Sequence, residues 1–157
     1  MTNNTATGIS LCHDGSNALD IKMAEAQRYR REIGQSGEEF VTRQELFKLE
    51  KIGYAGHTKD TSQILEAHFD RLSLNAYANP LCIEVKSTTR LDPHTDFYMS
   101  AEELEVAINC ARKGIAYEIH RVYGVGGHNI GRHIIPSEIL FLDYGFRCNE
   151  ITVYKKY

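Results

Sequence analysis

Leu81-Cys82-Ile83-Glu84-Val85-Lys86-Ser87-Thr88 is the stretch around which the rest of the chain is organised. Apolar and other residues alternate over 81–86, which is the two-residue period of a β-strand with one apolar face. Glu84 and Lys86 therefore point together to the other face. Burying charges costs desolvation unless they serve each other or a ligand. The pair is thus either an ion pair on a solvated edge strand or part of a site that binds a hard cation and a phosphate.

The composition is that of a single globular domain with a substantial core. Of 157 residues, 42% are hydrophobic, and no run approaches the roughly 18 apolar residues of a membrane span. The N-terminus shows no signal-peptide pattern, and the four cysteines form no C-x-x-C pair, so we expect a cytoplasmic protein with reduced thiols and no membrane partner. The formal net charge of −3 argues against a nonspecific nucleic-acid binder but leaves room for a locally basic groove.

The N-terminal part predicts a polar segment followed by helix. Residues 1–17 are polar and turn-rich, so we expect a disordered lead-in or linker, with residues 18–157 forming a single domain. A first helix is predicted over 18–32, and Gly34 would stop it shortly afterwards. Residues 1–33 and 124–157 otherwise carry no pattern from which we derive a role.

A second helix is predicted to begin at Ser36 and to end at Gly53. Ser36 and Glu39 have the spacing of a capping box, in which the two side chains bond each other's backbone amides. On residue pattern alone, this structural role of Glu39 is favoured over a functional one.

The centre of the chain predicts a β-hairpin. Residues 70–75 alternate, residues 75–80 contain the turn dipeptide Asn79-Pro80, and residues 81–86 follow as its partner strand. The spacing predicts two antiparallel strands that meet across this turn.

Downstream, the pattern predicts a helix and a third strand. Ser100 and Glu103 form another capping box, and Gly114 would end the helix that they open. Residues 115–123 are rich in β-formers. The glycine-rich segment 124–131 resembles a dinucleotide loop, but no helix pattern follows, so we interpret it as a turn.

The fold class that follows is α/β or α+β, with a small mixed central sheet flanked by helices. A final strand over 149–154 would complete it. Asp92-x-His94-x-Asp96 could suggest a metal site, but next to Pro93 we interpret it as turn chemistry.

The hairpin brings candidate metal ligands together. Asp70 precedes Glu84 by 14 positions, and adjacent antiparallel strands place such side chains at one end of a sheet. Two carboxylates and the backbone carbonyl of Val85 would hold Mg²⁺ or Mn²⁺. The cation would polarise a phosphate and lower the pKa of a water, while Lys86 would orient that water or offset developing charge.

Five blocks in order resemble the NO VEIN C-terminal domain family, a branch of the PD-(D/E)xK, restriction-endonuclease-like nucleases. They span about Gly37 to Tyr123, just over half the chain. The blocks are Gly37-Glu38-Glu39-Phe40-Val41, His68-Phe69-Asp70-Arg71-Leu72-Ser73, Ile83-Glu84-Val85-Lys86-Ser87-Thr88, Phe97-Tyr98-Met99-Ser100 with Glu103, and Ala116-Tyr117-Glu118-Ile119-His120-Arg121-Val122-Tyr123. His68 departs from the family's usual glycine, and residues 75–80 lack the glycines common there.

The resemblance implies a nuclease-type core with Asp70, Glu84 and Lys86 in its motif. It also implies Glu39 as a further acidic member from the first core helix. Glu103 and Tyr117 fall where the family has recurrent polar residues. Basic residues that could follow a nucleic-acid backbone, each equally explained as ordinary surface, are Lys86, Arg90, Arg112, Lys113, Arg121 and Arg132.

Three functions stay open from the sequence. The first is a divalent-metal-dependent endonuclease that acts on nucleic acid, with DNA as the expected substrate, as a module of a defence or restriction-type system. The second is a catalytically inactive nuclease-fold module that binds nucleic acid, a larger protein complex or a second copy of the chain. The third is an unrelated α/β binding domain in which the Glu84–Lys86 pair is structural.

Overall fold

The computed structural model describes residues 14–64 and 66–147. The chain divides into two units, residues 1–32 and 33–157. The predicted strand over 149–154 lies outside the described residues. The helices are α1 (Asp14–Lys51), α2 (Ala101–Lys113) and α3 (Ser137–Asp143), and the strands are β1 (Lys59–Asp60), β2 (Arg71–Leu74), β3 (Pro80–Ser87), β4 (Ala116–Tyr123) and β5 (Gly131–Pro136).

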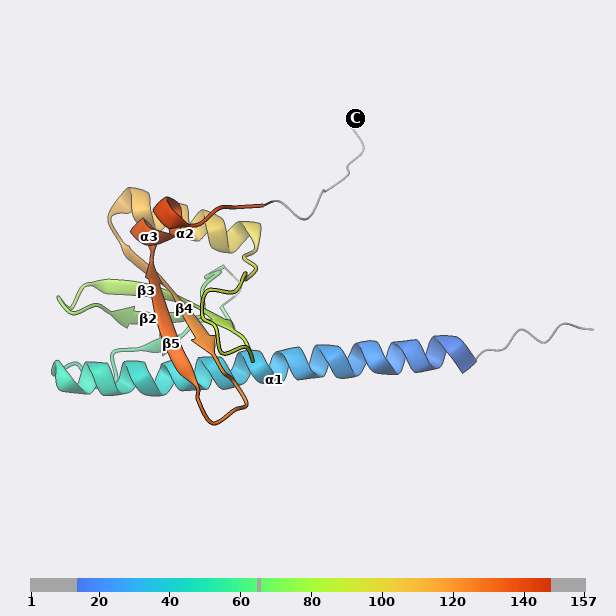
Figure 1. The fold of residues 1–157 in the computed structure, drawn as a ribbon. Coiled ribbons are helices and arrows are strands. Elements are labelled where there is room, and N and C mark those ends of the chain that lie inside the picture. The colour runs from blue at the N-terminus through green and yellow to red at the C-terminus, as the bar shows by residue number, and fades with distance from the viewer. Residues whose placement is uncertain (1–13, 65, 148–157) are drawn as a thin grey trace, which may run out of the picture. The chain divides into compact units, whose positions relative to one another are not determined.

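The strands form one mixed sheet in the order β1-β2-β3-β4-β5 (Figure 1). β3 is antiparallel to β2 and parallel to β4, and α2 makes the crossover that a parallel pair requires. The remaining neighbours are antiparallel. This α/β arrangement of a small mixed sheet flanked by helices confirms the predicted fold class.

The predicted hairpin is present and sets the register of the centre of the sheet. β2 and β3 pair from Arg71 opposite Ile83 to Leu74 opposite Pro80. In the turn, the side chain of Asn75 accepts hydrogen bonds from the backbone amides of Tyr77 and Asn79, at 2.9 and 3.0 Å. Such Asx contacts stabilise a tight reversal without the glycines that the family often has there.

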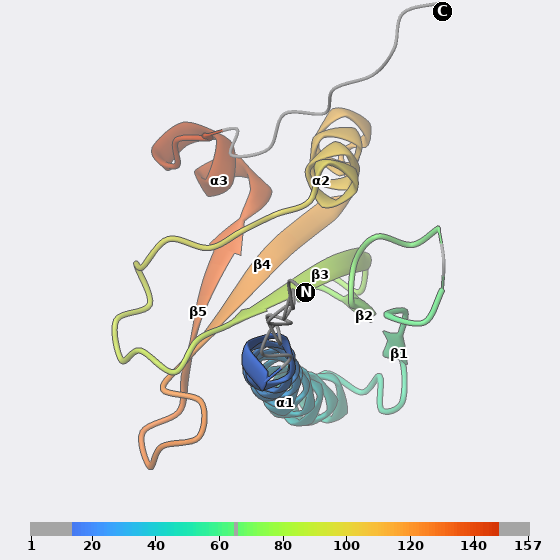
Figure 2. The ribbon, with the colours of Figure 1, turned by 90° about the vertical axis from the view of Figure 1, so that its right-hand side faces the viewer.

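Both faces of the sheet are covered (Figure 2). On one face, Val41 of α1 packs with Ile83 of β3 and Val122 of β4. On the other face, Cys82 and Tyr117 pack with Ala107 of α2 and Leu140 of α3. The face of β3 that carries Glu84 and Lys86 is therefore an interior face beneath α2. β3 is the central strand, so the prediction of a solvated edge strand is wrong, although the predicted ion pair between Glu84 and Lys86 is present.

The first two predicted helices are a single helix. α1 continues through Gly34, so Ser36 is not at a helix start and the predicted capping box with Glu39 is wrong. A glycine costs about 1 kcal/mol inside a helix, which burial of one face of a long helix can outweigh. Gly37 also has a packing reason, because a Cβ atom there would lie 1.9 Å from the Ser87 side-chain oxygen. The helix begins by Asp14, inside the expected lead-in.

The later elements follow the prediction more closely. Ser100 caps α2, Glu103 completes the capping box, and Gly114 ends the helix in a left-handed conformation with φ of 66°. The glycine-rich segment 124–131 is the turn between β4 and β5, as predicted. β5 and α3 were not predicted from the apolar residues that form them. No described helix has the length and apolarity to cross a membrane.

Candidate active site

Asp70 is fixed at the open end of the β2–β3 hairpin. Its backbone amide donates to the carbonyl of Ile83 at 3.0 Å, and its carboxylate accepts from the amide of Val85 at 2.7 Å. Burial raises the pKa of Asp70 despite that hydrogen bond and the nearby Lys86. The hairpin thus holds Asp70 beside the residues that follow Ile83, as the sequence predicted.

Glu84 and Lys86 are joined to α2 through a third charged residue. The ammonium of Lys86 lies 2.8 Å from the carboxylate of Glu84 and 2.7 Å from that of Glu103. Glu103 is held in turn by the Ser100 backbone amide at 2.9 Å. The capping box of α2 therefore positions a carboxylate at the site, a role that the capping motif alone did not reveal.

The cluster contains more carboxylates than ammonium groups. Glu84 is only 3% exposed, and burial, with Asp70 and Glu103 nearby, raises its pKa to about 8 despite Lys86. Burial alone would lower the pKa of Lys86, but Glu84 and Glu103 raise it above its usual value. Three carboxylates thus share one ammonium, which leaves room for further positive charge.

Tyr117 brings an unused polar group to the same place. It is 1% exposed, and its hydroxyl has no hydrogen-bond partner within the described part of the chain. Burial and the charges of Glu84, Glu103 and Asp70 raise its pKa. Buried hydroxyls are rarely unpaired, so Tyr117 offers a hydrogen-bond donor near these carboxylates that no described side chain uses.

The acidic residue of α1 that senses the charge of Asp70 is Glu38. Glu38 is half-buried, and its pKa is raised by burial and then by Asp70. The exposed Glu39 instead accepts a hydrogen bond from the side chain of Gln35 at 3.2 Å. The adjacent glutamates at 38 and 39 gave no sequence signal for which one faces the sheet, because that choice depends on the helical phase.

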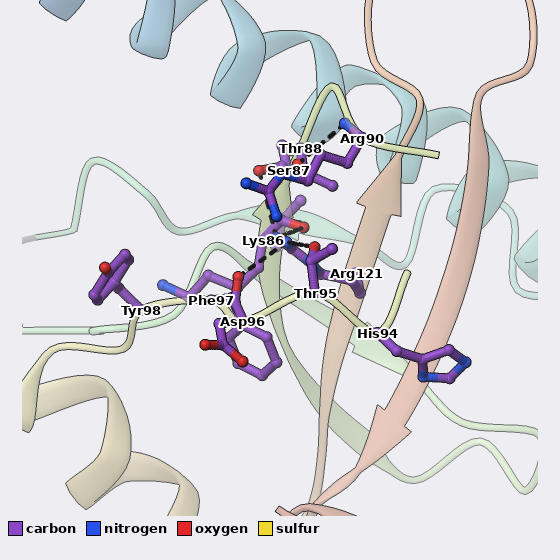
Figure 3. A pocket seen from close by; sticks show the side chains of 11 residues that line it. Lys86, Ser87, Thr88, Arg90, His94, Thr95, Asp96, Phe97, Tyr98 and Arg121 are labelled. Atoms are coloured by element: carbon purple, nitrogen blue, oxygen red, sulfur yellow. Dashed lines mark hydrogen bonds between the residues drawn. The ribbon is translucent and has the colours of Figure 1, made fainter. Parts of the chain in front are cut away.

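The predicted basic residues do not all lie together. Lys86, Arg90 and Arg121 line one pocket beside the acidic cluster (Figure 3). Arg112 is exposed in the last turn of α2 and does not line that pocket.

The donor set fits a divalent cation held by few protein ligands. Among the described residues, no group of three His, Cys, Asp or Glu side chains could hold a metal. Asp70, Glu84 and a backbone carbonyl remain the candidates, with water completing the shell as Mg²⁺ commonly requires. The ladder with β2 ends at Ile83, while the amide of Val85 points to Asp70. Because the amide and carbonyl of one strand residue point to the same side, we expect the Val85 carbonyl to point toward the β2 side of β3, as its amide does.

A second buried polar network, not predicted from the sequence, lies on the α1 face of the sheet. Glu45 accepts from Ser73 at 2.7 Å and from Arg132 at 3.2 Å, and it pairs with Lys48. Arg132 also contacts His120, at 3.3 Å. Arginine must donate there, so Nδ1 of His120 accepts and its Nε2 carries the proton toward Glu118 at 2.8 Å.

Comparison with known proteins gives one match. A family model described as "Protein NO VEIN, C-terminal" matches residues 37–135. The match includes α1 from Gly37, the hairpin, α2, β4 and most of β5, and therefore every residue of the acidic cluster. No curated protein and no solved structure shows significant similarity to the chain.

Proposed function

The chain belongs to the NO VEIN C-terminal family, and on that premise we propose that it hydrolyses phosphodiester bonds in nucleic acid, with DNA as the expected substrate and Mg²⁺ or Mn²⁺ as the cofactor. One observation carries the proposal: three carboxylates share a single ammonium at the open end of a hairpin. We further propose that the domain serves a defence or restriction-type system.

Each residue of the cluster has a distinct chemical task in this proposal. Asp70, Glu84 and the carbonyl of Val85 would hold the cation. When bound, it would polarise the phosphate and lower the pKa of a water. Lys86 has three N–H donors, of which Glu84 and Glu103 take two, so one remains for an oxygen of the water or the phosphate. Tyr117 can donate its unpaired hydroxyl to the same hydration shell.

The first test is cleavage of plasmid and single-stranded DNA in Mg²⁺ or Mn²⁺. Lys86→Ala and Asp70→Asn should each reduce the rate by about 10²-fold or more, because positioned proton-transfer and charge-stabilising groups contribute at least that much. Lys59→Ala, at an exposed lysine of β1, serves as the matched control and should cleave at the wild-type rate. Metal-dependent cleavage that persists in both site variants would contradict the assignment.

A second candidate function is a nuclease fold that binds nucleic acid or protein without turnover. The net charge of −3 favours it, because a free nuclease gains on-rate from a positive field. The same assay separates the two functions. No cleavage of any nucleic acid, with DNA binding unchanged in Lys86→Ala and Asp70→Asn, would support the binding module.

A further inference from the structure

A pocket of about 710 Å³ opens directly beside the acidic cluster. Its wall is shared with the cluster through Lys86, and the segment from Thr88 to Tyr98 forms much of its rim (Figure 3). The volume is of the size that ordinarily takes a small organic ligand. A group bound here would therefore lie next to whatever the carboxylates and Lys86 act on.

Arg121 of β4 is a buried cation at this pocket, and no described carboxylate pairs with it. It is 4% exposed, and its guanidinium donates to the carbonyls of Lys86 and Ser87 and to the hydroxyl of Thr95, at 3.2, 3.4 and 2.9 Å. A weaker contact reaches the Asp96 carbonyl at 3.4 Å, and Nε has no partner among the described residues. These neutral acceptors fix the position of the guanidinium but leave its charge uncompensated.

Arg90 adds a second cation whose backbone is fixed. Its amide donates to the Thr88 hydroxyl at 3.2 Å, and its carbonyl accepts from Gly124 at 2.7 Å. Its side chain is exposed and makes no ion pair within the described part of the chain. Burial and the proximity of Arg90 both lower the pKa of Arg121.

The two arginines of the pocket therefore favour an anion. Lys86 is paired with two glutamates, so among the lining residues the positive charges left for a ligand are the guanidinium groups of Arg90 and Arg121, opposed by the carboxylate of Asp96. The hydroxyls of Thr88 and Thr95 lie beside the arginines. Guanidinium groups with nearby hydroxyls are typical ligands of phosphate.

We propose that this pocket is a phosphate subsite that holds a backbone phosphate of the nucleic-acid strand next to the phosphodiester bond at Lys86. Arg90 contacts the phosphate, and Arg121 supplies fixed positive charge behind it. The inference rests on the proposed function for the identity of its ligand, because a nucleic-acid strand is what would present a phosphate one nucleotide away. It goes further by assigning the register of that strand.

The test is the binding of a fluorescein-labelled single-stranded DNA oligonucleotide in EDTA, measured by anisotropy at several salt concentrations. Arg90→Ala should weaken binding by about tenfold, the loss expected for one charge-assisted contact. It should also lower the slope of log K against log salt by about one. Arg90→Lys should recover most of the salt slope. Arg43→Ala, at an exposed arginine of α1, is the control and should bind as the wild type does.

Cleavage in Mg²⁺ distinguishes this inference from the proposed function. Binding that depends on Arg90 in a protein that never cleaves supports the subsite and overturns the nuclease proposal. Cleavage by a protein in which Arg90→Ala and Arg43→Ala bind alike, with equal salt slopes, overturns the subsite and leaves the nuclease proposal standing.

Discussion

Two buried glutamates on opposite faces of the sheet differ in how their charge is compensated. Glu45, 1% exposed on the α1 face, is hydrogen-bonded by Lys48, Ser73 and Arg132. Burial raises its pKa, but the hydrogen bonds from Lys48 and Ser73, together with nearby His120, reverse the effect and lower it. Among the described residues, Glu84 on the α2 face is paired only with Lys86, which it shares with Glu103, and its pKa is raised to about 8.

We interpret this difference as one between a structural charge and a charge that serves a ligand. Glu45 has enough donors to stay ionised in the interior, so it serves to join α1 to the sheet. Glu84 lies in a group that is short of positive charge, and such a group is stable as an anion only when something else supplies that charge. Equal burial thus corresponds to opposite roles, and the partners decide which role applies.

The largest effect should come from removing the compensated carboxylate. Glu45→Ala should lower the free energy of unfolding by about 3–5 kcal/mol, because it leaves Arg132 and Lys48 beside a buried hydroxyl with no anion. Urea denaturation followed by circular dichroism measures this. Glu39→Ala, on the exposed side of the same helix, should stay within about 0.5 kcal/mol of the wild type. Equal losses in both variants would remove the distinction.

Removing the charge of the uncompensated Glu84 should change the free energy of unfolding in the opposite direction. Glu84→Gln should raise the free energy of unfolding in EDTA, by about 2 kcal/mol at pH 8. The pKa of Glu84 is raised in the folded state from 4.5 to about 8. The contribution of the protonated Glu84 to wild-type stability is therefore fully present below pH 4.5 and is lost as the pH rises through about 8, whereas the glutamine cannot ionise.

The pH dependence of Glu45→Gln provides the matched comparison for Glu84→Gln. The pKa of Glu45 is lowered in the folded state, so its contribution to stability is present above pH 4.5 and lost below it. Glu45→Gln should therefore be most destabilised near neutral pH. Parallel pH profiles for the two glutamine variants would contradict the proposed difference in compensation.

The smallest effect concerns His120 in the α1-face network. It is fully buried, and burial lowers its pKa, with Arg132 adding to the effect while Glu118 and Glu45 oppose it. The unfolded chain therefore takes up a proton below about pH 6.5 that the folded chain resists. Wild-type stability should fall by on the order of 1 kcal/mol as the pH falls below that value.

Denaturant titrations across this pH range should show a flatter profile for His120→Gln. His128→Gln, at an exposed histidine, is the control, and its free energy of unfolding should fall with pH as steeply as that of the wild type. If the free energy of His120→Gln also falls as steeply, the fall in stability has another source.

The sequence predicted the elements whose signals are local. The capping box of Ser100 and Glu103, the hairpin turn and the alternation of β3 are all set by neighbours within a few residues. These local signals were enough to place Asp70 beside β3. Gly34 wrongly predicted a helix end. Its low helix propensity is a local property, whereas the packing of α1 on the sheet is not.

What the sequence did not predict depends on contacts between distant segments. Asp70 raises the pKa of Glu38, whereas the exposed Glu39 bonds Gln35, because of the phase of α1 against the sheet. Glu103 was recognised as a cap, but its bond to Lys86 needs the crossover of α2. The roles of Glu45 and Arg132 depend on an interaction across 87 positions that no local pattern encodes.

The most direct test of the central claim is the melting temperature with and without Mn²⁺ or Mg²⁺. A cation that binds only the folded protein stabilises it by about 2.7 kcal/mol when the free cation concentration is 100 times the dissociation constant. The wild type and Glu45→Gln should both melt at a higher temperature with the metal, while Asp70→Asn and Glu84→Gln should not. A wild type that does not respond to either metal, or a response that is equal in all four proteins, would contradict the assignment of the α2-face carboxylates as a cation site.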